Sequence, residues 1–195
     1  MRELQTGLWH WEAPHPGWKP GEEWDQAVSS YAIDDGERLL LFDPLALPRE
    51  IEALAGERDM AIVLTCPWHV RDAHSLAQKL GAALHVPPPD EGDPNPVDGQ
   101  VFRAGARLPV GVEAFPGMEP NDLLLWVENR QALVAGDTLI DRGTGLEFPV
   151  DWANKGVPPE QILAELRRVL ELPVELVLAT HGGPANRAAL ERALS

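Results

Sequence analysis

Residues 176–184 read Leu-Val-Leu-Ala-Thr-His-Gly-Gly-Pro. The first four residues are an apolar run of strand length, and His181 follows them after one threonine. A run of this kind, without polar alternation, indicates a strand that is covered on both faces of its sheet. The two glycines leave the backbone beside His181 open, and we expect Pro184 to begin a helix. Loops at strand ends are where rigid scaffolds hold reactive groups, so His181 is a candidate site residue.

Two other segments have the same form. Asp137 comes just after the apolar run Ala-Leu-Val-Ala, with one glycine between them. Cys66, His69 and His74 all lie in segment 64–74, between a predicted strand and a predicted helix. A carboxylate and several imidazoles from three such loops are what a zinc or iron site requires.

The rest of the chain predicts an α+β protein. Strands outnumber helices, and each half has several strands before a strand-helix unit, which favours two sheets packed face to face with helices outside. The expected strands are 8–11, 30–33, 38–42, 61–64, 84–86, 101–108, 111–115, 123–128, 132–135 and 176–179. The expected helices are 48–55, 73–80, 159–170 and 185–194. We expect one domain, residues 1–195, because neither side of the proline-rich loop 87–96 is long enough for a core of its own.

Composition and charge argue against several classes of partner. Asp and Glu outnumber Lys and Arg by 31 to 16, and the net charge of −15 repels phosphate backbones and anionic lipid. We therefore expect a small-molecule ligand or substrate, with no nucleic acid and no membrane as partner. No apolar run could span a bilayer, and residues 1–7 lack the apolar core of a secretory signal, which predicts a cytoplasmic protein. The single cysteine excludes an intrachain disulfide.

In this order and spacing, the segments resemble the metallo-β-lactamase-fold superfamily over nearly the whole chain. Residues 40–44 (Leu-Leu-Phe-Asp-Pro) resemble its early strand ending in aspartate, and residues 98–117 resemble the segment that leads to its Pro-Gly-His motif. Residues 135–139 (Ala-Gly-Asp-Thr-Leu) resemble its Ala-Gly-Asp motif, and residues 180–184 (Thr-His-Gly-Gly-Pro) its Gly-His-Gly motif. The resemblance implies a four-layer αββα sandwich with a cleft between the edges of the two sheets.

The chain departs from the main ligand signature of that superfamily, which is His-x-His-x-Asp-His. Read without gaps from Thr65, the four ligand positions hold Cys66, Trp68, Val70 and Arg71. The Pro-Gly-His motif is also changed, because residues 116–118 read Pro-Gly-Met. Only Asp137 and His181 match expected ligand positions. The metal-ligand motifs are therefore degenerate, which argues against a dinuclear site.

One metal ion could still bind, either zinc or another divalent metal. The resemblance implies Asp137 and His181 as two of its ligands, and His69 is the best third candidate. The remaining candidates are Cys66, His74, His10 and His15. Three protein ligands and water are the minimum for catalysis by a Lewis-acidic metal. This set predicts a hydrolase with a single or weakened metal site, acting on a small ester, thioester, amide or phosphoester.

Other interpretations stay open. The chain could be a non-catalytic member of the fold that has lost the metal and uses the same cleft to bind a ligand or partner. Alternatively, the guanidinium of Arg71 could fill the place of the metal and pair with Asp137. Each candidate also has a structural interpretation: His69 as a helix cap, and Cys66 and His74 as packing side chains.

Four of the seven tryptophans lie within the first 30 residues, next to several prolines. They could form a lid over a site or a contact between two copies in a homodimer, because tryptophan contributes strongly to pockets and interfaces. The interpretation that we favour is that their rings pack against the edge of the sheet.

Overall fold

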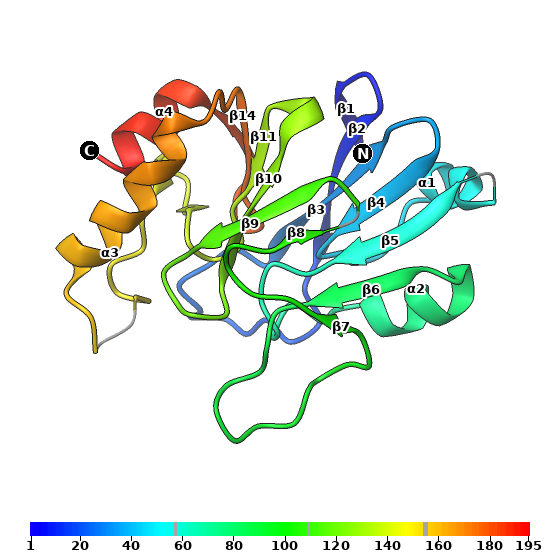
Figure 1. Cartoon of the computed structure of the whole chain (residues 1–195), viewed down its shortest axis with the longest axis horizontal. Helices are drawn as coiled ribbons and strands as arrows, with labels where there is room; N and C mark the ends of the chain where they lie inside the picture. The colour runs from blue at the N-terminus through cyan, green and yellow to red at the C-terminus, as the bar shows by residue number, and fades with distance from the viewer. Residues whose placement is uncertain (57, 109, 154–155) are drawn as a thin grey trace. The chain divides into compact units, whose positions relative to one another are not determined.

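The chain folds into two compact units, each built on its own β-sheet (Figure 1). Unit 1 comprises Met1–Phe102 and unit 2 comprises Arg103–Ser195 in this computed structural model. The described residues are 1–56, 58–108, 110–153 and 156–195. The prediction of one domain over the whole chain stays a prediction. Among the described residues, none of the helices has the length and hydrophobicity that crossing a membrane requires.

Unit 1 contains a seven-stranded sheet whose strands lie side by side in chain order. The strands are β1 (Arg2–Gln5), β2 (Leu8–Pro14), β3 (Ala27–Asp34), β4 (Arg38–Phe42), β5 (Asp59–Val63), β6 (Ala83–Val86) and β7 (Gln100–Val101). Pairing is antiparallel from β1 to β4 and parallel from β4 to β7. The strands predicted over residues 30–33 and 38–42 are confirmed, and they pair as a hairpin with Tyr31 opposite Phe42.

Two helices connect the parallel strands of unit 1. α1 (Arg49–Ala55) links β4 to β5, and α2 (Ala73–Leu80) links β5 to β6. Parallel neighbours need such crossovers because the chain must return to the same end of the sheet. Gly81 ends α2 in the left-handed conformation, with φ 66°, directly after the predicted helix 73–80. The segments after β4 and β5 therefore leave the sheet at the same edge.

The tryptophans near the N-terminus pack inside unit 1. Trp11 is buried in the core, and its Nε1 donates a hydrogen bond of 2.8 Å to the carbonyl of Leu45. Trp9 packs against the same core, and Trp24 packs against a smaller buried cluster. These rings pack within unit 1 as expected, but Trp9 and Trp11 lie on β2, inside the sheet and not at its edge. The homodimer stays a prediction.

Unit 2 contains a six-stranded sheet in the order β15-β14-β11-β10-β9-β8 and a separate two-stranded sheet, β12-β13. The strands are β8 (Arg107–Leu108), β9 (Val112–Pro116), β10 (Leu123–Val127), β11 (Ala132–Val134), β12 (Ile140–Asp141), β13 (Leu146–Glu147), β14 (Leu176–Leu178) and β15 (Pro184–Asn186). The helices are α3 (Pro159–Leu166), α4 (Arg187–Ala193) and two 3₁₀ helices, η1 (Glu128–Arg130) and η2 (Arg167–Glu171). Because β11 and β14 pair parallel, the segments that follow them begin at the same edge of the sheet.

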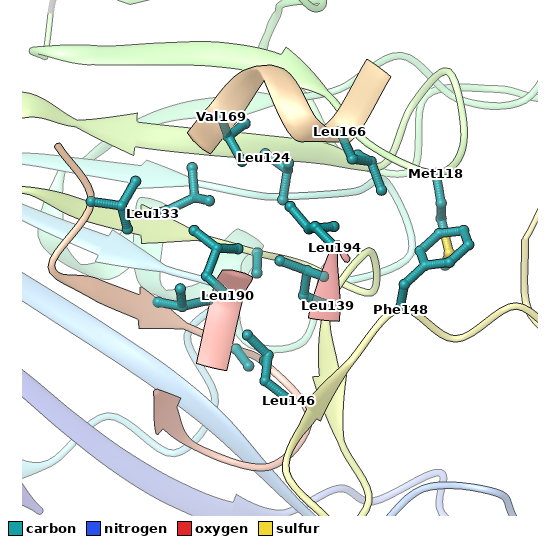
Figure 2. Close-up of a cluster of buried hydrophobic side chains, with 14 of the residues drawn as sticks. Met118, Leu124, Leu133, Leu139, Leu146, Phe148, Leu166, Val169, Leu190 and Leu194 are labelled. Carbon is teal, nitrogen blue, oxygen red and sulfur yellow. The ribbon is translucent and has the colours of Figure 1, made fainter. Parts of the chain in front are cut away.

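The hydrophobic core of unit 2 joins its helices to its sheet. Leu166 of α3, Val169 of η2 and Leu190 of α4 belong to one buried cluster together with Leu124 and Leu133 of the strands (Figure 2). The helix predicted for residues 159–170 therefore packs on the sheet, although the last part of that segment is the tighter η2.

The prediction of a single strand over residues 101–108 is wrong. The segment forms two short strands, β7 and β8, which belong to the sheets of different units. Between them the chain turns at Gly105, whose φ of 85° lies in the region that glycine adopts freely. A turn inside a mixed apolar and polar segment leaves no clear trace in the residue pattern.

The predicted start of the last helix is also wrong. Pro184 begins strand β15, which pairs antiparallel with β14, and α4 begins after Asn186. The side chain of Asn186 caps the helix by accepting a hydrogen bond of 3.0 Å from the backbone N–H of Ala189. In this segment the asparagine is a better marker of the helix start than the proline.

Candidate functional site

In unit 1, a buried carboxylate at the end of β4 holds the loop that follows β5. Asp43 accepts two hydrogen bonds from Thr65, one from its backbone N–H at 2.9 Å and one from its hydroxyl at 2.6 Å. Both side chains are fully buried. Asp43 also has a φ of 44°, a strained backbone conformation for a residue with a side chain. These contacts fix the start of the loop that carries His69.

His69 is oriented by the same pair of residues. Its Nδ1 lies 3.1 Å from Asp43 Oδ2 and 3.1 Å from Thr65 Oγ1, and the ring is buried. We call Asp43, Thr65 and His69 the Asp43 cluster. When Nδ1 donates its proton to the carboxylate, Nε2 is the nitrogen left for a ligand or a proton. Metal-binding histidines are commonly held in this way by a carboxylate on the opposite nitrogen.

Cys66 and Arg71 occupy two positions where the resemblance leads one to expect metal ligands. Cys66 is buried, and its sulfur lies 3.9 Å from the hydroxyl of Thr65. Arg71 has a φ of 40°, and its Nη1 donates to the carbonyls of Ser29 at 2.8 Å and Asp43 at 2.7 Å. In unit 1 this guanidinium therefore ties the main chain of β3 to the end of β4. The expected pairing of Arg71 with Asp137 stays a prediction.

The other candidate histidines of unit 1 lie in different surroundings from His69. His74 is on the exposed face of α2, where its Nε2 lies 3.1 Å from the side-chain amide of Gln78. His10 is buried on β2, 2.8 Å from the hydroxyl of Ser29, and burial lowers its pKa from 6.5 to about 4. His15 contacts the ring of Trp24 edge-on in the loop after β2. These three histidines therefore lie outside the Asp43 cluster.

In unit 2, the structure brings together the two residues that retain expected ligand positions. Asp137 follows β11 and His181 follows β14, and these two strands are parallel neighbours. The distance from His181 Nε2 to Asp137 Oδ1 is 3.2 Å, and both side chains are buried. The hydroxyl of Thr180 donates a hydrogen bond of 2.7 Å to the carbonyl of Gly136, which holds the two loops in register. The two residues therefore lie side by side at the ends of neighbouring strands, and their role as site residues stays a prediction.

A second buried carboxylate organises the loop around Asp137. Asp122 accepts from the hydroxyl of Thr138 at 2.6 Å and from the backbone N–H of Asp137 at 3.3 Å. The hydroxyl of Thr138 in turn accepts from the backbone N–H of Met118 at 2.9 Å. We call Asp122, Thr138 and the backbone of Gly117 and Met118 the Asp122 cluster. It resembles the Asp43 cluster of unit 1, since in both a buried aspartate binds a threonine next to a candidate site residue.

Trp152 contacts His181, and Arg142 in turn lies over Trp152. The ring of Trp152 contacts the imidazole edge-on, with 5.7 Å between ring centroids and 88° between planes. The guanidinium of Arg142 lies 5.0 Å over the ring of Trp152 and forms an ion pair of 2.8 Å with Asp151. Trp152 thus restricts the rotation of the histidine ring.

Met118 occupies the position of the histidine in the Pro-Gly-His motif. Its side chain is buried in the hydrophobic core of unit 2, where it lies at the same end of the cluster as Phe148 (Figure 2). Met118 is therefore a packing residue of this core.

Sequence reasoning missed several residues of these clusters. Asp122 belongs to no recognisable sequence motif. Its role depends on contact with Asp137, fifteen residues further along the chain. Trp152 and Arg142 likewise act through tertiary contacts alone. Thr65 and Thr138 offered a signal, because each is a polar residue next to a candidate ligand at the end of a buried strand.

Comparisons with known proteins agree with this description. No family model matches the chain. The chain is 28% identical over 153 residues to the lactamase-like protein aptB of Emericella nidulans, covering 68% of this chain and 49% of that protein. It is 28% identical over 136 residues to an atrochrysone carboxyl ACP thioesterase of Aspergillus chevalieri, covering 64% of this chain and 44% of that protein. The chain thus spans about half the length of the curated relatives it matches.

Solved structures show the fold over a larger part of the chain. A metallo-β-lactamase family protein from Thermus thermophilus superposes with a TM-score of 0.66 at 19% identity, covering 98% of this chain and 78% of that chain. The protein TTHA1623, solved in a di-iron-bound form, gives a TM-score of 0.63 at 25% identity over 85% of this chain and 93% of that chain. The chain therefore has the metallo-β-lactamase fold and is a divergent example of it, which confirms the predicted α+β class.

Proposed function

We propose that the chain is a metal-dependent hydrolase with a single, weakened metal site, and that it cleaves a small ester or thioester. The fold and the lactamase-like and thioesterase relatives support hydrolysis as the class of reaction. The thioesterase name belongs to relatives of low identity, and it supports the choice of an acyl bond over a phosphoester.

The observation that carries this proposal is the Asp137–His181 pair. Two donor atoms bound to one tetrahedral zinc ion at about 2.0–2.2 Å lie about 3.3–3.5 Å apart. The distance between His181 Nε2 and Asp137 Oδ1 is 3.2 Å, so the two side chains are already arranged nearly as two ligands of one ion would be. The Asp122 cluster and Trp152 keep them there.

The donor set also fits a divalent metal in its chemistry. An imidazole and a carboxylate suit zinc, and His69 adds a second imidazole whose Nδ1 already faces a carboxylate. Cys66 is a further candidate because thiolate sulfur is a strong zinc ligand. A metal held by these residues would supply Lewis acidity to the carbonyl of the substrate and activate water at neutral pH.

The protein's own side chains have defined tasks in such a reaction. Asp137 and His181 would act as ligands through Oδ1 and Nε2, the two atoms that already face each other at 3.2 Å. Asp43 keeps the imidazole of His69 in one orientation through its contact of 3.1 Å with Nδ1. Neither task requires a side chain to move, because Asp137 already contacts His181 and Asp43 already contacts His69.

The proposal is tested by metal content and ester hydrolysis of the same preparations. We expect about one equivalent of zinc or iron in the wild type, and loss of both metal and p-nitrophenyl acetate hydrolysis in Asp137→Asn and His181→Ala. Asp25→Asn, the same change at an exposed carboxylate of unit 1, is the control and should retain both. His69→Ala, Cys66→Ser and His74→Ala identify the third ligand. Less than a tenth of an equivalent of metal in the wild type, with no uptake on titration, would contradict the proposal.

A second candidate function is supported by the former ligand positions themselves. Met118 packs in a hydrophobic core, and Arg71 binds main-chain carbonyls, so both positions now have structural roles. A non-catalytic protein that binds a ligand without metal would show these changes. In that case Asp137→Asn should leave stability and ligand binding unchanged in the presence of a chelator.

A further inference from the structure

A groove runs along α3 of unit 2, and neither Asp137 nor His181 lines it. It consists of two adjoining cavities of about 450 and 220 Å³, which share Ala104, Pro116 and Glu165 in their walls. The larger cavity lies between β9 and the η2 end of α3, and the smaller one continues past the start of α3. We call the two together the α3 groove. Their volumes are those of sites that hold small molecules.

The smaller end of the α3 groove reaches the Asp122 cluster. Gly117 and Met118 line this end, and the backbone N–H of Met118 donates to Thr138, the residue after Asp137. A Cβ atom at Gly117 would overlap with the carbonyl of Asp122 and the hydroxyl of Thr138, so the backbone lies directly against the cluster. A ligand that fills the groove would therefore end close to the candidate catalytic loop.

The walls of the groove favour an apolar occupant. Aliphatic and aromatic side chains form much of the lining, namely Phe115, Val157, Ile162, Val169 and Leu172. Ala104 and Gly105 also line the larger cavity, and neither brings a large side chain to it. Such walls gain free energy from covering hydrocarbon, in proportion to the area removed from water.

The charges at the rim disfavour an anionic occupant. Glu113, Glu165 and Glu171 line the larger cavity together with one arginine, Arg168, which is paired with Glu165 at 3.2 Å. The second arginine nearby, Arg107, is paired with Glu113 at 3.1 Å. Excess carboxylate at the rim repels fatty acid anions and accepts neutral molecules.

We propose that the α3 groove binds the apolar acyl chain of a neutral ester or thioester substrate. This inference rests on the proposed function, because it identifies the groove as the place for the acyl part of the same substrate. The inference predicts that the protein hydrolyses esters of long acyl groups in preference to acetyl esters. It also predicts that the protein does not retain the carboxylate product.

The test combines hydrolysis with direct binding. Hydrolysis is compared for p-nitrophenyl octanoate and p-nitrophenyl acetate, and binding is measured by calorimetry for 2-decanone and decanoate, which are not hydrolysed. Ala104→Trp and Gln161→Trp obstruct the two cavities from exposed positions, and Ala164→Trp places the same ring on the exposed face of α3 outside the groove. Each buried methylene contributes about fourfold to binding. We therefore expect the octanoate preference in kcat/KM to fall at least tenfold in the two obstructed variants and to persist in Ala164→Trp.

The binding measurements separate this inference from the proposed function. If no ester is hydrolysed but 2-decanone binds the wild type and not Ala104→Trp, the proposed function fails and the groove stands as an apolar site. If 2-decanone does not bind the wild type, binds Ala104→Trp equally well, or binds more weakly than decanoate, the inference is overturned even when acetate is hydrolysed.

Discussion

His181 depends on neighbours that no sequence motif contains. Its ring is fixed on one side by Trp152, which is itself covered by Arg142. Residues that orient a metal ligand commonly change metal affinity by 10–100-fold when they are replaced. The contact therefore links a side chain without ligand atoms to the strength of the proposed metal site.

We predict that Trp152→Leu weakens zinc binding about tenfold, because the imidazole of His181 gains rotational freedom. Trp152→Phe, which keeps an aromatic ring, should recover part of the loss. The measurement is the zinc Kd from competition with a chromogenic chelator. Trp18→Leu, in a loop of unit 1, serves as the control. An unchanged Kd in Trp152→Leu would show that the ring does not position the histidine.

Gly117 matters at the same scale for a steric reason. A methyl group there would overlap with Asp122 and Thr138, and both partners are buried and hydrogen-bonded to each other. We predict that Gly117→Ala lowers the free energy of unfolding by about 1–3 kcal/mol, as overpacking of a rigid core does. Urea denaturation measures this. Gly56→Ala is the matched control, because nothing lies within 4 Å of its Cβ position and its φ is −67°.

Single elements were predictable where one local pattern sufficed. α2 shows helical spacing of apolar residues and ends at a glycine, and the β3–β4 hairpin has an Asp-Gly turn, so both could be read from the sequence. β7, β8 and β15 could not, because they are two or three residues long and their strand character comes only from pairing with a neighbour. The candidate site divides in the same way. Asp137 and His181 follow recognisable strands, whereas Asp122 contributes through a distant loop.

The β2–β3 hairpin contains a histidine that responds to pH. Burial, and to a lesser extent Arg2 and the N-terminal amine, lower the pKa of His10 from 6.5 to about 4. The unfolded chain therefore binds more protons than the folded one between these values. Its contribution to stability is complete above pH 6.5 and is lost as the pH falls toward 4, at up to about 1.4 kcal/mol for each pH unit.

We predict that His10→Gln, which can still bond to Ser29, makes the fall in stability between pH 6.5 and 5 less steep than in the wild type. Urea titrations at several pH values measure the difference. The buried His85, whose pKa burial also lowers, is present in both proteins and cancels in the comparison. Parallel curves for the two proteins would contradict the assignment to His10.

At the scale of the whole molecule, charge is the dominant feature. The net charge of −15 means that negative groups repel one another in the folded chain more than in an expanded one. We predict that raising NaCl from about 20 to 500 mM, which shortens the Debye length several-fold, increases Tm by a few degrees. Differential scanning fluorimetry measures this, with sucrose at matched osmolarity as the control. A constant or falling Tm would show that the repulsion is already compensated by local pairs.

The parallel pairing of β11 with β14 has a consequence for the order of folding events. These strands are separated by about forty residues, so the loop between them must close before Val134 meets Leu178. Strands that are far apart in the sequence pair late and slowly, whereas the hairpins of each sheet form from local segments. Asp137 and His181 meet only in that late step. Their proximity therefore reports complete folding, and a destabilised variant should lose the site while much of its secondary structure remains.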